Sequence, residues 1–131
     1  MQLSKNYSLE ELCATNSKLE NRPNQNNINS LSLLVKEVLQ PLRDLYGKPI
    51  HVSSGFRSAL VNKSVGGVPT SEHCFGRAAD LDTGSKEENE KIYNLIKNNI
   101  PYWRQLINEK NFSWVHVSYN RDDNKKQLLK L

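Results

Sequence analysis

The fold is decided by two short stretches of sequence, Ser71-Glu-His73-Cys-Phe-Gly76-Arg-Ala78-Ala-Asp80 and, further along, Trp114-Val-His116-Val-Ser118. Two of the three histidines of the chain lie in these stretches. Gly76 separates His73 from Asp80, so the chain can turn at the glycine and bring both side chains to one place. The two stretches therefore supply three side chains of the kinds that bind metal ions.

The side chains around His116 alternate in polarity as they do in a β-strand. With a period of two, the valines on either side of His116 point to one face of the strand, and His116 points to the other face with Trp114 and Ser118. The valines mark the face that packs on the core. We therefore expect His116 to face a cleft, and Asp80 to share a face with Asp82 if 78–82 is a strand.

A set of two histidines and one aspartate suits zinc. Three protein ligands leave the fourth tetrahedral position for a water molecule, which distinguishes catalytic zinc sites from structural ones. His73, Asp80 and His116 are thus candidate ligands of an open metal site; taken singly, each could equally be an ordinary polar residue near the surface.

The rest of the chain predicts helices first and then strands mixed with one helix. A capping box from Ser8 to Glu11 predicts a short helix, and apolar residues at three- and four-residue steps from Leu31 to Leu45 predict an amphipathic helix that Pro41 kinks or restarts. The Asn- and Ser-rich residues 16–30 are predicted to form a loop. Strands are expected over 49–54, 78–82, 104–107 and 114–118, and further helices over 59–62 and 87–99.

The length of 131 residues fits one domain over residues 1–131, and 37% hydrophobic with 24% charged residues is typical of a soluble protein. No apolar run is long enough to span a membrane. The N-terminus carries polar and acidic residues where a secretory signal has an apolar run, which predicts a cytoplasmic protein unless a separate route releases it. The net charge of +4 favours an anionic polymer as partner, either nucleic acid or acidic cell-wall material.

The two cysteines, Cys13 and Cys74, form no CxxC pair and are expected to be free thiols. Cys74 and Glu72 both adjoin His73. Because neighbours on an extended segment point to opposite faces, both are expected to point away from the metal site.

The two stretches resemble the signature of the zinc D-alanyl-D-alanine carboxypeptidase family of peptidoglycan peptidases. The resemblance runs from about Tyr7 to Tyr119 and also takes in Ser53-Ser-Gly55-Phe-Arg57-Ser58, Asn62 and Val65-Gly66-Gly67. It implies the α+β fold shared with lysostaphin-type peptidases and hedgehog signalling domains, in which a small antiparallel sheet carries the zinc and helices pack on one side. It also implies that His73, Asp80 and His116 bind one zinc ion.

The resemblance suggests roles for further side chains in a hydrolysis that needs one group to accept and return a proton. Glu109, seven residues before His116, is the candidate for this role, with Asp82 as the reserve or as a partner of a ligand. Arg57 matches the family arginine that contacts substrate, where it could hold a carboxylate or stabilise an oxyanion.

Two side chains are assigned to substrate binding alone. Ser71 fits a hydrogen bond to substrate or to a ligand, and Trp114 stands where several relatives carry another histidine, so it is expected to form an apolar wall. His51 lies outside every motif and is expected to be structural.

These assignments predict a monomeric zinc metallopeptidase that hydrolyses a peptide bond in peptidoglycan stem peptides, as a carboxypeptidase or an endopeptidase. An endolysin-like role in cell-wall lysis or remodelling, of phage or bacterial origin, would follow. The alternative is a non-catalytic zinc module of the same fold used for binding or assembly. Nucleic-acid binding is not favoured, since no basic stripe is interleaved with aromatic residues.

Overall fold

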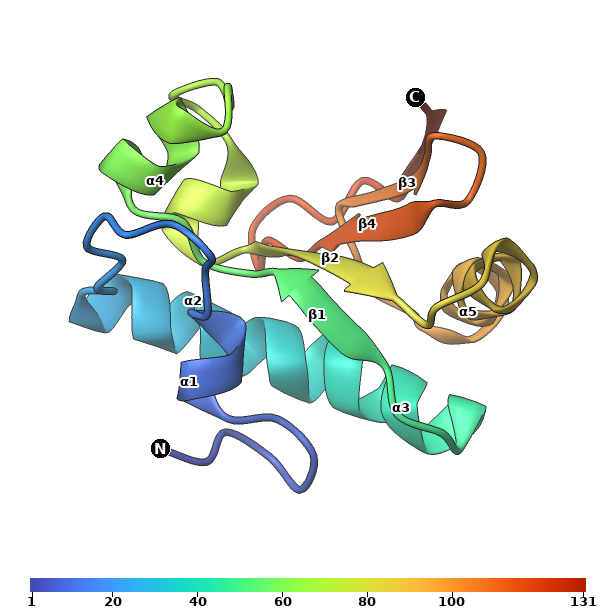
Figure 1. The fold of residues 1–131 in the computed structure, drawn as a ribbon. Helices are drawn as coiled ribbons and strands as arrows, with labels where there is room; N and C mark the ends of the chain where they lie inside the picture. Colours follow the sequence, from blue (N-terminus) through green and yellow to red (C-terminus); the bar gives the residue numbers. More distant parts are fainter.

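The computed structural model describes residues 1–131 and shows a five-stranded sheet lying against a long helical segment (Figure 1). The strands stand in the order β1-β2-β4-β3-β5. Their bounds are β1 His51–Ser54, β2 Ala78–Asp82, β3 Gln105–Glu109, β4 Trp114–Ser118 and β5 Gln127–Lys130. Helices lie before the strands and between them in the sequence, so the predicted α+β class is confirmed.

The last strand makes the sheet mixed. The pairs β1–β2, β2–β4 and β3–β4 are antiparallel, as predicted, but β5 runs parallel to β3, with Gln105 opposite Gln127. The sequence predicts no strand after Ser118, because the residues from Arg121 to Lys130 are mostly charged and polar. β5 is an edge strand whose side chains are largely exposed, so no buried face leaves an apolar pattern in its sequence.

A long helical segment runs along one face of the sheet and consists of α2 (Gln25–Leu34), the π-helical turn η1 (Val35–Leu39) and α3 (Gln40–Tyr46) (Figure 1). In η1 the N–H of Gln40 donates to the carbonyl of Val35, five residues back. Pro41, which has no N–H to donate, stands in the first turn of α3. The restart predicted at Pro41 is therefore confirmed, in the form of a wide turn within a continuous segment.

The start of α2 contradicts the prediction of a loop over residues 16–30. Asn24 Oδ1 accepts a hydrogen bond of 2.8 Å from the N–H of Asn27, and Asn27 Oδ1 accepts one of 3.0 Å from the N–H of Asn24. This reciprocal cap begins the helix at Gln25. The prediction is wrong because asparagine is common in loops and also among the best helix caps.

The other helices are short, apart from the one that follows β2. α1 begins after Ser8, whose Oγ accepts from the N–H of Glu11, as the capping box predicts. The bounds of the four are α1 Leu9–Leu12, α4 Ala59–Ser64, the 3₁₀ turn η2 Glu72–Phe75 and α5 Lys86–Asn99.

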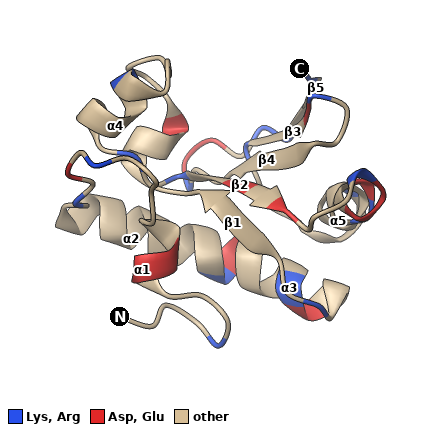
Figure 2. Ribbon diagram, in the orientation of Figure 1, with Lys and Arg blue, Asp and Glu red and all other residues tan.

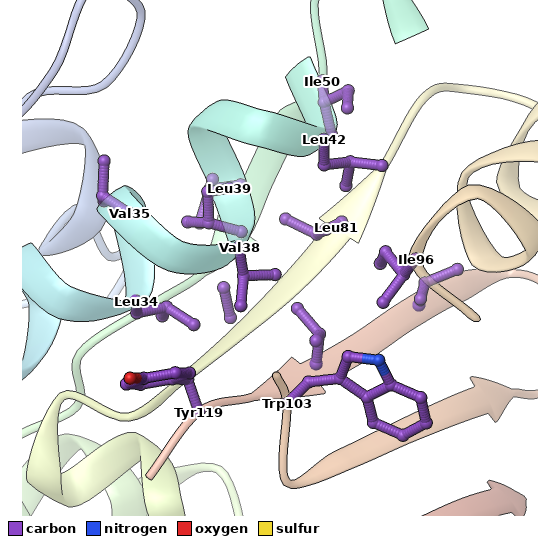
Figure 3. Close-up of a cluster of buried hydrophobic side chains, with 14 of the residues drawn as sticks. Leu34, Val35, Val38, Leu39, Leu42, Ile50, Leu81, Ile96, Trp103 and Tyr119 are labelled. Atoms are coloured by element: carbon purple, nitrogen blue, oxygen red, sulfur yellow. The ribbon is translucent and has the colours of Figure 1, made fainter. Parts of the chain in front are cut away.

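The core lies between the helices and one face of the sheet. Figure 3 shows Leu34, Val38 and Leu42 of the helical segment gathered around Leu81 of β2, with Ile96 of α5 beside them. Leu45 was predicted to join this stripe but is 51% exposed. The extra residue in the π turn rotates the face that follows by about a third of a turn, which carries Leu45 off the core side.

The opposite face of the sheet is free for a site. Val115 and Val117 are fully buried in the core, so the side chain of His116 between them lies on the other face, as predicted.

No helix is apolar and long enough to cross a membrane. Lys and Arg are spread over several elements, and α5 carries charges of both signs (Figure 2).

Candidate metal centre

Three side chains from separate elements converge above the free face of the sheet. His73 in η2, Asp80 in β2 and His116 in β4 place one ligand atom each within 4.8 Å of the others. Asp80 and His116 lie directly opposite each other in the β2–β4 ladder. His73 reaches them because Gly76 ends η2 in the left-handed conformation, with φ of 74°.

The distances from Asp80 to the two histidines fit neighbouring ligands of one tetrahedral ion. His116 Nδ1 lies 3.0 Å and His73 Nε2 lies 3.4 Å from the same oxygen, Oδ1 of Asp80. Zinc bonds of about 2.0–2.2 Å place neighbouring tetrahedral ligand atoms about 3.3–3.6 Å apart. These separations are therefore close to the edges of a coordination tetrahedron.

The tautomer of His73 is fixed by the backbone behind it. Its Nδ1 lies 2.7 Å from the carbonyl oxygen of Gly55, which can only accept a hydrogen bond. Nδ1 therefore carries a proton, which leaves Nε2, beside Asp80, as the nitrogen that can bind a metal ion. A histidine held in this way is the usual arrangement at zinc sites, so the side chains present fit the ion.

Asp80 is an ionised carboxylate with both oxygens in use. Burial alone would raise the pKa of Asp80, but the contacts with His116 and His73 outweigh burial and hold this pKa below its ordinary value. While Oδ1 faces the histidines, Oδ2 lies 3.4 Å from Arg57 Nη2. Asp80 therefore joins the candidate ligand set to the arginine behind it.

Arg57 uses all three of its guanidinium nitrogens within the protein. Besides Asp80, its Nε donates to Ser54 Oγ at 3.0 Å and its Nη1 to Asn62 Oδ1 at 3.2 Å. Asn62 is only 2% exposed and donates in turn to the carbonyl of Val68. The contact of Arg57 with substrate stays a prediction; the structure places this side chain against a ligand, outside the residues that line the cleft beside the metal site.

The candidate ligands open onto a cleft of about 590 Å³. Ser71, Glu109 and Trp114, which the sequence assigns to the site, all line this cleft. Its other lining residues are Val68, Thr70, Glu72, Arg104, Gln105 and Ile107, together with the three candidate ligands. Glu72 was predicted to point away, but residues 72–75 form a 3₁₀ turn in which the alternation of an extended segment does not apply.

Glu109 lies on the same face of the sheet as His116. Ile107 is directly opposite His116 in the β3–β4 ladder, and Glu109 is opposite Trp114. Since every second residue shares a face, Glu109 is the diagonal neighbour of His116, at a Cα separation of about 7–8 Å. Asp82, the reserve candidate, instead accepts from Gly84 N–H and Asn89 Nδ2 in the turn after β2.

Comparison with known proteins adds to this geometry. The family model described as peptidase M15 matches residues 5–118. The chain belongs to the peptidase M15 family. A stretch of 49 residues is 51% identical to a zinc D-Ala-D-Ala carboxypeptidase of Streptomyces albus G, over 37% of this chain and 19% of that protein. The match thus spans about a fifth of the length of this curated relative.

The loop between β3 and β4, which follows Glu109, has an unusual backbone in this M15 chain. Lys110, Asn111 and Phe112 have φ values of 49°, 54° and 60°. Residues other than glycine seldom adopt the left-handed region, so three in succession need support from their surroundings. The contacts around this loop therefore help to set the position of Glu109.

Asn89 of α5 supplies much of that support, and the sequence analysis gave it no role. It is 1% exposed, and its Nδ2 donates to the carbonyls of Phe112 at 2.9 Å and Ser113 at 3.2 Å. Its Oδ1 accepts from the N–H of Thr83 at 2.8 Å. The sequence offered one signal for this role: Asn89 is a polar residue on the buried side of a predicted helix, and a buried amide needs hydrogen-bond partners.

Substitution of Gly55 tests the orientation of His73. In Gly55→Ala the new Cβ would lie 2.2 Å from the backbone oxygen of Leu12, so the segment that carries the Gly55 carbonyl must shift. We expect zinc affinity to fall about 10- to 100-fold, the usual effect of losing a partner of a ligand, in a competition assay with a chromogenic chelator.

Gly47→Ala is the matched control for this substitution. Gly47 has φ of 75° and open space around it, so alanine there strains the backbone without touching the site. It should lower stability and leave zinc affinity unchanged. Equal zinc affinities for Gly55→Ala and the wild type would contradict the role given to the Gly55 carbonyl.

Substitution of Asn89 tests the support of the β3–β4 loop. Asn89→Ala leaves the half-buried carbonyls of Phe112 and Ser113 without this donor, so we expect a loss of about 1–3 kcal/mol in the free energy of unfolding. Amide exchange of Ser113, whose N–H donates to the carbonyl of Glu109, should become faster. Asn99→Ala, at an exposed position of the same helix, should change neither quantity, and unchanged exchange in Asn89→Ala would refute the assignment.

Proposed function

We propose that this protein is a zinc-dependent peptidase that hydrolyses a peptide bond in peptidoglycan stem peptides. The observation that carries the proposal is the set of distances from Asp80 Oδ1 to the two histidines, inside a cleft that also holds Glu109. Membership of the M15 family and the name of the Streptomyces relative support the peptidase activity and the substrate. Action on the cell wall as carboxypeptidase or endopeptidase, in lysis or remodelling, is part of the proposal.

His73, Asp80 and His116 would hold one zinc ion through Nε2, Oδ1 and Nδ1. When bound, zinc polarises a carbonyl and lowers the pKa of water towards 7, which is the chemistry that peptide hydrolysis requires. The protein keeps the ligands in place: Gly55 orients His73, and Arg57 pairs with the outer oxygen of Asp80. The candidate ligands are thus held by contacts on the side away from the cleft and are accessible from the cleft.

Glu109 is the residue we propose for proton transfer. It lies at the end of β3 on the cleft face, next to the position of His116. A carboxylate there can accept a proton from the attacking water and deliver it to the departing amine nitrogen. Trp114, directly opposite Glu109 in the ladder, provides an apolar wall beside this carboxylate, and the Oγ of Ser71 caps η2 by accepting from the N–H of His73.

Digestion of purified peptidoglycan tests the proposed activity. The zinc-loaded protein should release products with new amino and carboxyl termini, and mass spectrometry identifies the bond that is cut. Glu109→Gln should lower the rate about 100- to 10,000-fold with zinc content unchanged, because only the proton-transfer group is lost. Glu90→Gln, on an exposed position of α5, is the control and should retain full activity.

A metal assay on separate variants tests the ligand set. The wild type should bind one zinc ion per chain, and His116→Ala should lose high-affinity binding, since two ligands hold zinc poorly. His51→Ala removes an exposed histidine outside the site and should bind as the wild type does. Zinc binding together with intact peptidoglycan after digestion would favour the non-catalytic module instead.

A further inference from the structure

One cation lines the cleft, and none of the steps above uses it. Arg104, just before β3, is the sole arginine or lysine among the lining residues. Its side chain is 21% exposed, and Nε donates to Asp123 Oδ2 at 3.2 Å. No protein acceptor lies within hydrogen-bonding distance of either Nη, so the fork of the guanidinium is available to a ligand.

The backbone of Arg104 is held on both sides. Its N–H donates to the carbonyl of Ser118 at 2.7 Å, and its carbonyl accepts from the N–H of Gln127 at 2.9 Å. These bonds tie the residue to the ends of β4 and β5. A guanidinium that is anchored in this way and also paired through Nε keeps its two outer nitrogens in a defined place, which suits a two-pronged bond to a carboxylate.

The position of Arg104 along β3 suggests which carboxylate it meets. Ile107 lies directly opposite His116. Measured along the chain from Ile107, Arg104 is three residues away, about 10 Å, and Glu109 is two residues away in the opposite direction, about 7 Å. A substrate carbonyl beside the metal ligands would thus lie between them. Each residue of an extended peptide spans about 3.3–3.6 Å, so a carboxylate on the next residue comes within reach of the arginine side chain.

Arg104 is the only positively charged side chain that the cleft offers to this carboxylate. Glu72 and Glu109 line the same cavity and would repel an anionic group. Arg57 donates to Ser54, Asn62 and Asp80, and it is not among the lining residues. A substrate with a free carboxylate near the scissile bond therefore finds its charged partner in Arg104.

We infer that Arg104 binds a free carboxylate on the residue that follows the scissile bond, an inference that rests on the proposed peptidase function. Two stem-peptide groups have this chemistry: the terminal carboxylate of a C-terminal D-alanine, and the α-carboxylate of a glutamate linked through its γ-carboxyl group. Arg104 is thus a specificity-determining residue for peptides that carry a negative charge at this position.

Pairs of peptides that differ only in this charge test the inference. One pair ends in D-Ala-D-Ala as the free acid or the C-terminal amide, and the other contains L-Ala-γ-D-Glu with its α-carboxylate free or amidated. In at least one pair the wild type should prefer the acid. Arg104→Gln should lower kcat/KM for that acid about 10- to 100-fold and leave the amide unchanged. The pair that responds identifies the source of the carboxylate.

Three further variants separate recognition from structure. Arg104→Lys keeps the charge but not the fork and should retain part of the preference. Asp123→Ala removes the carboxylate that holds Arg104 Nε and should weaken the preference for the acid less than Arg104→Gln does. Arg121→Gln lowers the net charge equally at an exposed site and should leave activity unchanged. If Arg104→Gln lowers the rates of acid and amide equally, Arg104 is structural and the inference is wrong.

A binding measurement tests the role of Arg104 even if neither peptide is hydrolysed. In the zinc-loaded Glu109→Gln protein, titration calorimetry should show tighter binding of the acid than of the amide, and adding Arg104→Gln should remove the difference. A wild type that cleaves neither pair refutes the proposed peptidase activity on these peptides, while the calorimetry still reports on Arg104. Equal binding of acid and amide in both pairs overturns the inference.

Discussion

The pairing of β2 with β4 is the constraint on which the site depends. It sets Asp80 opposite His116, with Ala79 opposite Val117 and Leu81 opposite Val115 on the core side of the same ladder. These four apolar residues are fully buried. A slip of one residue would turn one strand's apolar side chains out of the core and its ligand into it. Core packing therefore fixes the register, and the register fixes the separation of the two ligands.

His73 comes from outside the sheet and depends on backbone contacts between distant segments. The carbonyl of Gly55 fixes its ring, and the next residue, Phe56, donates its N–H to the carbonyl of Leu12 at the end of α1. On the other side of His73, Gly76 packs so closely on the carbonyl of Asn27 in α2 that a Cβ would lie 2.5 Å from it. The N-terminal helices thus help to place a candidate ligand although none of their side chains lines the cleft.

The sequence predicted correctly those elements in which buried and exposed side chains alternate with the period of the helix or strand. The alternation around His116 predicted the bounds of β4 and its two faces, and the signature brought His73 and Asp80 into one candidate ligand set. Two elements were not visible in the sequence: β5 has no apolar face, and the capping asparagines of α2 look like loop residues. Arg104 was missed because it depends on distant partners: Asp123 belongs to a later segment, and the place of Arg104 in the cleft follows from the sheet.

The charges of the cleft are opposite in sign to those of the whole chain. The protein carries a net charge of +4, yet three carboxylates line the cleft, those of Glu72, Asp80 and Glu109, against the single guanidinium of Arg104. Arg57 offsets part of this excess through the outer oxygen of Asp80. Carboxylates gathered in one concave site repel one another more strongly than they would in open water, because the protein around them screens charge less than water does. A divalent cation beside Asp80 would offset this excess of negative charge, so metal binding and the proposed binding of a carboxylate at Arg104 would favour each other.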